Sequence, residues 1–257
     1  MTNILQLKFP TIGEKKSTII VEAGHIYTNE QPTLEHQAGA TWGNMLSSYL
    51  AFFGAEIKKW LFIDNYNPQF ENKPQNLDVA GYIESLSASG FAPDEVVYEA
   101  DLVEHAKEVV ASLQKQGYAS QHQNGKTILH KGNILLYDPQ KEKYMCSLLD
   151  ACLYLRKLEQ ADGCITVLDK QYDAQQKGTL AILKKLGVKT TSIFPFFYSS
   201  PNSSSHSSVD LSNVYTNGKS GLSFVQPAID LLQIVAKLSG SVSANSSLEV
   251  EIGKYDV

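Results

Sequence analysis

The chain has 257 residues, of which 43% are hydrophobic and 19% are charged, as in an ordinary globular protein with room for a substantial core. Its 27 Asp and Glu residues outnumber 22 Lys and Arg residues, which leaves a net charge of −5. This balance excludes a global positive field of the kind that drives nucleic-acid binding. No apolar run approaches the roughly 20 residues that a membrane-spanning helix needs, so no membrane partner is expected.

The three cysteines, Cys146, Cys152 and Cys164, form no CxxC pair and lie in apolar surroundings. An odd number of buried thiols is typical of a reducing compartment. The first residues, MTNILQLKFPTIGEKK, contain no long apolar stretch of the kind found in secretory signals. The sequence therefore predicts a cytoplasmic protein.

Short β-branched or aromatic runs alternate with longer segments whose apolar residues recur at helical spacing. In chain order, the expected elements are a strand at 17–21, a helix at 36–53, strand 60–63, helix 77–89, strand 95–98, helices 100–116 and 148–160, strand 164–168, helix 174–186 and strand 189–197. This alternation is typical of an α/β fold. We predict a Rossmann-like parallel sheet with helices on both faces and right-handed crossovers.

We expect one domain over residues 1–257. Segment 118–143 contains two short apolar runs with Asn-Gly and Lys-Gly-Asn turns, which predicts a hairpin or a small β insertion rather than a second domain. The serine-dominated stretch 199–213 predicts a flexible loop.

Polar side chains follow the first two expected strands, where parallel sheets bind ligands. His25 follows the first strand, Asp64 and Asn65 follow the second, and His36 starts the first long helix. The free N–H groups and the positive dipole end of a helix start favour phosphate, and an imidazole there can donate to the same phosphate. The structural alternatives are a hydrogen-bonded His25, an Asx turn at 64–68 and a solvated loop histidine at position 36.

The same stretch resembles the nucleotide-binding half of the class I aminoacyl-tRNA synthetases, most of all the arginyl type. The resemblance rests on a strand ending in Val-Glu, the segment Thr33-Leu34-Glu35-His36, and a helix that carries Gly43 and ends at Gly54. In that family the loop carries the HIGH motif, whose histidines meet the phosphates of ATP. Thr33 stands in place of the first histidine and Glu35 in place of the glycine. The resemblance implies nucleotide contacts from His25, Thr33, His36 and Gly43.

A second stretch, at about 130–190, follows the same family pattern. Asp150 and Gln171 match, by position, an aspartate and a glutamine that the family uses for the amino acid and the ribose of ATP. With Asp64 and Asn65, they are the expected substrate-binding residues. Lys219, in the segment Asn-Gly-Lys-Ser-Gly, is the nearest counterpart of the lysine-bearing KMSKS loop. No anticodon-binding domain is recognised, so tRNA is not a favoured partner.

The resemblance implies a protein that binds ATP, with Mg²⁺, and activates an amino acid or a similar carboxylate as an adenylate. His36 and Lys219 would be its catalytic residues, and no resident metal site is predicted. Two alternatives stay open. Glu35 and the missing KMSKS residues favour a catalytically inactive relative that binds a ligand or a partner. A nucleotidyltransferase of the same superfamily is the other, since a fold does not specify its reaction.

Overall fold

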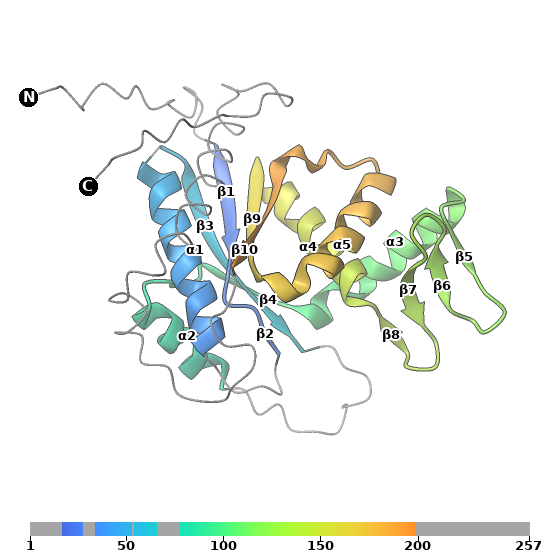
Figure 1. The fold of residues 1–257 in the computed structure, drawn as a ribbon, viewed down its shortest axis with the longest axis horizontal. Helices are drawn as coiled ribbons and strands as arrows, with labels where there is room; N and C mark the ends of the chain where they lie inside the picture. The colour runs from blue at the N-terminus through green and yellow to red at the C-terminus, as the bar shows by residue number, and fades with distance from the viewer. Residues whose placement is uncertain (1–16, 28–33, 53, 66–77, 199–257) are drawn as a thin grey trace, which may run out of the picture.

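The computed structural model describes residues 17–27, 34–52, 54–65 and 78–198 (Figure 1). Thr33, Lys219 and the expected loop at 199–213 lie outside the described residues. Within the described ranges, no helix combines the length and the apolar character that crossing a bilayer requires.

The central element is a sheet whose recorded strand pairs are all parallel. β1 (Thr18–Glu22) lies between β3 (Glu56–Asp64) and β9 (Gly163–Asp169), and β10 (Ile193–Tyr198) pairs with β9. β4 (Glu95–Tyr98) pairs with the side of β3 that faces away from β1, because Trp60 is the register partner of both Glu22 and Glu95. After a short turn, β2 (Ile26–Tyr27) continues beside the end of β3.

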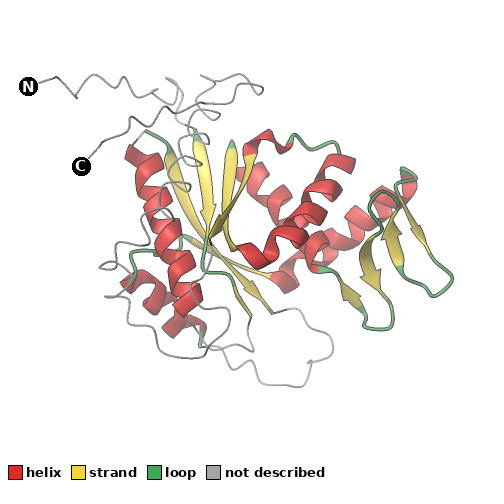
Figure 2. Cartoon of the chain, viewed as in Figure 1, coloured by secondary structure: helices red, strands yellow, loops and turns green. Residues whose placement is uncertain are grey.

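Helices cover both faces of this sheet, as the sequence predicts (Figures 1 and 2). α1 (Leu34–Phe52) and α2 (Val79–Ala88) lie on one face. α3 (Val103–Lys115), α4 (Cys146–Gln160) and α5 (Asp173–Lys185) lie on the other. Two separate hydrophobic clusters result, because successive strand residues point to opposite faces. In β1, Ile19 and Val21 join the α1 cluster while Ile20 joins the α4 cluster.

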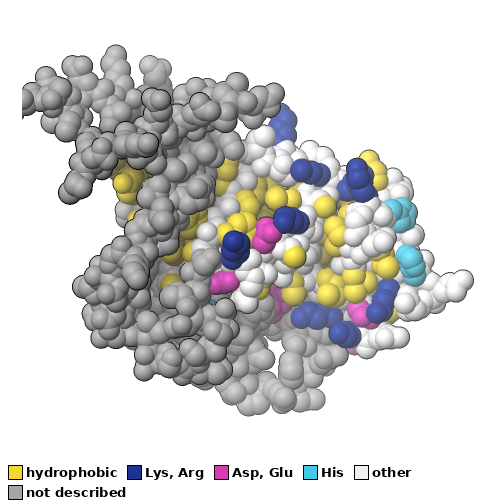
Figure 3. All heavy atoms as spheres, viewed as in Figure 1, with side chains coloured by type: hydrophobic (Ala, Val, Ile, Leu, Met, Phe, Trp, Pro, Cys, Tyr) yellow, Lys and Arg dark blue, Asp and Glu magenta, His cyan; other side chains and the backbone are white. Residues whose placement is uncertain are grey.

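The predicted β insertion is a separate antiparallel sheet of four strands. It consists of β5 (Ala119–Gln121), β6 (Thr127–Leu129), β7 (Ile134–Asp138) and β8 (Lys143–Tyr144). Figure 1 shows it beyond α3, away from the parallel sheet. Histidine side chains gather on the surface at this end of the molecule, where His122 and His130 are exposed (Figure 3).

The predicted elements correspond to observed ones with shifted ends. The helix expected at 100–116 begins as a 3₁₀ turn, η2 (Glu99–Leu102), before α3 starts. The strand expected at 189–197 begins later, because a second 3₁₀ turn, η4 (Thr190–Ser192), precedes β10. A third such turn, η3 (Lys170–Tyr172), connects β9 to α5. Segment boundaries of this kind depend on tertiary contacts that a periodic pattern does not contain.

Gly43 sets how closely α1 approaches the end of β1. A Cβ atom at this position would lie 2.4 Å from the Cβ of Ala23 and 3.0 Å from the ring of Phe91. Both neighbours are buried in the α1 cluster, so neither can move away freely. The close packing of α1 against Ala23 and Phe91 therefore explains why this helix has a glycine in its middle, without reference to any ligand.

We expect Gly43→Ala to destabilise the protein even though alanine is the better helix former. Overpacking costs about 1–3 kcal/mol, against a gain of about 1 kcal/mol in helix propensity. Urea unfolding measures the difference. Ser48→Ala, at an exposed position of the same helix, is the control and should leave the unfolding free energy nearly unchanged. A Gly43→Ala protein as stable as the original would contradict the close approach.

Candidate functional site

The candidate site lies where the strand order reverses. The chain builds β3 and β4 on one side of β1 and then crosses back to place β9 on the other side. In open α/β sheets, the crevice at the carboxyl ends of strands beside such a reversal is where ligands bind. Glu22 is the last residue of β1 and Thr166 is its register partner in β9, so both side chains stand at this point.

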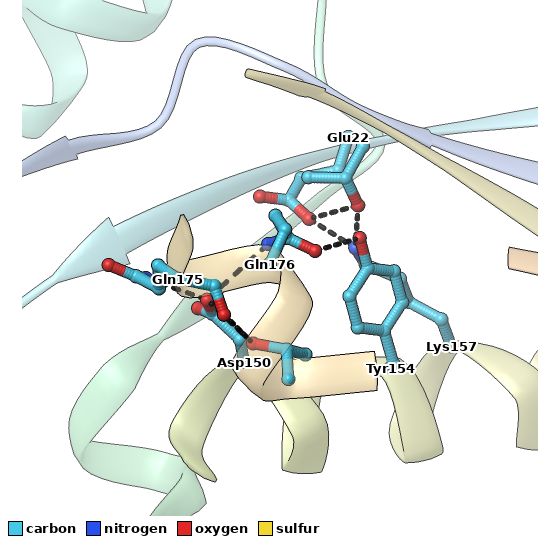
Figure 4. Close-up of polar contacts among 8 residues, drawn as sticks. Glu22, Asp150, Tyr154, Lys157, Gln175 and Gln176 are labelled. Carbon is cyan, nitrogen blue, oxygen red and sulfur yellow. Dashed lines mark hydrogen bonds and ion pairs between the residues drawn. The ribbon is translucent and has the colours of Figure 1, made fainter. Parts of the chain in front are cut away.

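A buried ion pair occupies this position. Lys157, on α4, donates to a carboxylate oxygen of Glu22 and, over 2.8 Å, to the hydroxyl of Thr166. The Thr166 hydroxyl in turn donates to the same Glu22 oxygen over 3.2 Å. All three side chains are buried, and the ammonium lies 4.5 Å from the ring centre of Tyr154 (Figure 4). Charges removed from water need this kind of pairing and hydrogen bonding, because otherwise their desolvation is not compensated.

Asp150 lies two turns before Lys157 on the same face of α4. Its Oδ2 atom accepts from the Gln175 amide at 2.7 Å, and more weakly from Gln176 and Thr179 at 3.5 Å (Figure 4). None of the described residues donates to Oδ1. Burial raises the pKa of Asp150 to about 7, although the hydrogen bond from Gln175 acts in the opposite direction. This carboxyl group can therefore exchange a proton near neutral pH.

These side chains surround a small cavity. Its volume is about 10 Å³, close to the space that one water molecule needs. Polar and aromatic groups from four segments of the chain meet there. The lining includes Glu22, His25, Asp150, Lys157, Tyr172 and Gln175. The described residues thus form a closed polar floor rather than an open ligand-sized pocket.

A second polar cluster lies at the end of β3. Asp64, Glu99 and Cys146 place one potential metal-ligand atom each within 4.8 Å of the others. Burial raises the pKa of Glu99 to about 10, and a hydrogen bond with Asp64 contributes. Burial also raises the pKa of the Cys146 thiol, to about 11. At neutral pH Glu99 therefore keeps its proton, which removes the repulsion that two adjacent buried charges would have.

The two candidate histidines lie at the same edge of the sheet. Burial, followed by the charge of His25, lowers the pKa of His36 to about 4, and burial also lowers the pKa of His25. His36 makes an edge contact with the ring of Tyr82, at 6.3 Å between centroids. The Tyr82 hydroxyl donates to the carbonyl of Gly24 over 2.6 Å, next to His25. Both imidazoles are therefore neutral at pH 7 and can donate or accept without carrying charge.

The other predicted site residues fall in different places. Asn65 accepts from the backbone N–H of Ala100 over 2.9 Å, which holds η2 against the end of β3. Gln171 is exposed, and its backbone N–H is bound by Asp169. The glutamine that reaches Asp150 is Gln175, one turn further on. The predicted ligand contacts of Asn65, Gln171 and Gly43 stay predictions.

Sequence reasoning missed Glu22, Lys157, Thr166 and Gln175 as members of this site. One signal was available: Asp150 and Lys157 are seven residues apart, which places two opposite charges on one face of a largely apolar helix. Glu22 also ends a strand that is otherwise completely apolar in its last residues. Neither feature identifies its partner, because the partner of each residue lies on a different element: Gln175 of α5 for Asp150, and Lys157 of α4 for Glu22.

We expect Asp150→Asn to flatten the pH dependence of stability. Because the folded-state pKa of Asp150 is about 7 and its ordinary value is 3.8, the unfolded chain releases this proton first. The contribution is fully present below about pH 4 and is lost as the pH rises to about 7, a change on the order of 4 kcal/mol. Urea unfolding at pH 5 and pH 7.5 measures the larger part of this change, roughly 2–3 kcal/mol.

Glu99 titrates over an overlapping range, so the informative quantity is the difference between the Asp150→Asn protein and the original at each pH. Asp101→Asn, at an exposed position, should keep the original slope. An unchanged slope for Asp150→Asn would mean that this carboxyl group titrates alike in the folded and unfolded chains.

Comparison with known proteins agrees with this architecture. No protein-family model matches the sequence, and no curated protein matches it. Among solved structures, the arginyl-tRNA synthetase of Thermus thermophilus is similar, with a TM-score of 0.58, 12% identity, and coverage of 87% of this chain and 57% of that one. The arginyl-tRNA synthetase of Plasmodium falciparum gives a TM-score of 0.55, 11% identity, and coverage of 89% and 51%.

The chain thus spans little more than half the length of these synthetases, and at such low identity the likeness concerns the fold alone. It agrees with the parallel sheet and its helices. The chain therefore has the fold of a class I aminoacyl-tRNA synthetase catalytic domain, as its sequence predicts.

Proposed function

We propose that the protein binds ATP and activates an amino acid, or a similar small carboxylate, as an adenylate. The observation that carries this proposal is the joint position of His25, His36 and Asp150 around the carboxyl edge of a synthetase-like sheet. Each comes from a separate element, and together they offer groups for both reactants at one edge.

The nucleotide would lie over the start of α1. His36 stands in the first turn of that helix, where backbone N–H groups and the helix dipole favour phosphate. A neutral imidazole there donates a hydrogen bond to a phosphate oxygen without bringing positive charge. Magnesium bound with ATP would supply the main compensation of the phosphate charge. His25, Thr33 and Gly43 are the further proposed nucleotide contacts.

The amino acid would lie on the other side of the edge, at Asp150. The Oδ1 atom of Asp150 can accept from a ligand ammonium while Gln175 holds Oδ2. Asp64 and Asn65, at the end of β3, and Gln171, after β9, are further candidates. The edge would thus hold the two reactants close together, which is the main contribution a protein makes to such a transfer.

In the reaction, a carboxylate oxygen of the amino acid attacks the α-phosphorus of ATP. A new P–O bond forms, the bond to the β-phosphate oxygen breaks, and pyrophosphate leaves with the bonding electrons. His36 would donate to the phosphates during this change. Lys219 would place a cation beside the leaving pyrophosphate, as preorganised charge does in phosphoryl transfers.

A catalytically inactive, ligand-binding relative is the second candidate. The small volume of the cavity, about 10 Å³, supports it, because the described residues already satisfy one another there. Glu35 supports it as well, since a carboxylate near the proposed phosphates is repulsive. A nucleotidyltransferase of the same superfamily is the third candidate, and it would transfer a nucleotidyl group to a phosphorylated small molecule.

We expect ATP–pyrophosphate exchange that depends on one amino acid and falls at least 100-fold in His36→Ala, roughly the effect of losing one transition-state donor. His105→Ala removes a histidine of α3, far from the proposed nucleotide, and should leave exchange unchanged. Nucleotide binding without exchange would favour the inactive relative. If calorimetry detects no nucleotide binding, the enzyme proposal is wrong.

We expect Glu35→Gly to strengthen nucleotide binding, because it removes a negative charge next to the proposed phosphates. A gain of roughly tenfold corresponds to 1.4 kcal/mol, a modest value for one like-charge interaction near a protein surface. Calorimetric titration with a non-hydrolysable ATP analogue measures it. Glu108→Gln, at an exposed position of α3, controls for the loss of one negative charge. A fall in affinity for Glu35→Gly would show that the loop is placed wrongly.

A further inference from the structure

We propose that the amino-acid site selects a substrate with an uncharged side chain, because Lys157 already occupies the place where a substrate cation would meet Glu22. This inference rests on the proposed function and adds to it the chemical class of the substrate. Three features carry it: the internal pairing of Glu22, the single remaining acceptor on Asp150, and the closed floor between them.

The acidic group at the strand reversal is neutralised within the chain. A buried glutamate at the carboxyl end of a parallel strand would by itself attract an ammonium or a guanidinium. Here the Lys157 ammonium contacts Glu22 directly and Thr166 over 2.8 Å, and Thr166 closes the triangle with a 3.2 Å bond to Glu22. Lys157 and Glu22 are both almost completely buried, so the pair is not open to exchange with a ligand cation in solution.

Asp150 offers one carboxylate oxygen, Oδ1, to a ligand cation. The described hydrogen bonds to this carboxylate all go to Oδ2, from Gln175, Gln176 and Thr179. Oδ1 can therefore accept from the α-ammonium that every amino acid carries. Among the described residues that line the cavity, Glu22 is the other carboxylate, and it is paired with Lys157.

A cationic side chain would find no unpaired anionic partner among the described residues of this cavity. Glu22, Asp150 and Lys157 line it together, so the Lys157 ammonium already takes the position beside Glu22 that a second ligand cation would need. The remaining lining consists of hydroxyl, imidazole, aromatic, aliphatic and amide groups, including Tyr172, Leu168 and Gln175. An apolar or neutral polar side chain lying over this floor would leave no buried charge without a partner.

The first experiment measures amino-acid binding to the unmodified protein by calorimetry in the presence of a non-hydrolysable ATP analogue. Norleucine and glutamine serve as uncharged probes, lysine and arginine as cationic probes of similar length. We expect the better uncharged amino acid to bind at least tenfold more tightly than either cationic one. Equal or tighter binding of lysine or arginine would overturn the inference and leave adenylate formation intact.

The second experiment tests the site's charge without any reaction. Lys157→Ala leaves Glu22 without its cation, and we expect n-butylammonium to raise the thermal unfolding midpoint of this variant more than n-butanol does. The double variant Glu22→Gln with Lys157→Ala is the matched control and should show no preference for the ammonium. Equal effects of the two additives on Lys157→Ala would overturn the inference, because Glu22 would then not require a cation.

The outcomes separate the inference from the function on which it rests. Absence of any amino-acid binding, together with a positive ammonium effect, contradicts the proposed function and shows that Glu22 and Lys157 form only a structural pair. Where Lys157→Ala does not fold, the binding comparison with the unmodified protein decides alone. Exchange with a cationic amino acid, and none with uncharged ones, would reject the selectivity while supporting the enzyme.

Discussion

The buried pair of Glu22 and Lys157 is the interaction on which the centre of the molecule depends. It joins the end of β1 to the last turn of α4, and Thr166 connects β9 to the same group. These elements meet at the point where the strand order reverses. The pair therefore connects α4 to the carboxyl ends of the two strands at this point, β1 and β9. An ion pair in this position constrains geometry more than it adds stability, because much of its attraction compensates the loss of hydration.

The pair also determines the electrostatic character of the edge. Glu22, Asp64, Glu99 and Asp150 are all buried, and Lys157 is the one cation buried with them in the described part of the chain. Protons reduce the excess negative charge, since burial raises the pKa of Glu99 to about 10 and that of Asp150 to about 7. The edge therefore carries less negative charge than its four carboxyl groups would bring if all were ionised and unpaired.

The residues proposed to contact the two reactants come from helices on opposite faces of one sheet. His36 starts α1, on the face of the first hydrophobic cluster, whereas Asp150 lies on α4, on the face of the second. The turn after β1, which contains Gly24 and His25, lies between them. Gly43 matters to this arrangement through packing, because it lets α1 approach Ala23 at the base of that turn. Changes on one face are thus expected to reach the other through β1.

The sequence by itself determined the order and type of the elements, because apolar periodicity and glycine positions are local properties of the chain. It placed His25, Asp64 and Asp150 at or near the carboxyl edge of the sheet, since strand ends and a charge in an apolar helix can be recognised without coordinates, and their ligand contacts stay predictions. Only the tertiary structure decided that Glu22 pairs with Lys157, that Gln175 rather than Gln171 reaches Asp150, and that Glu99 forms a hydrogen bond with Asp64. Each of these contacts joins residues from different elements, and a pattern read along one chain contains no information on which distant side chain will lie opposite.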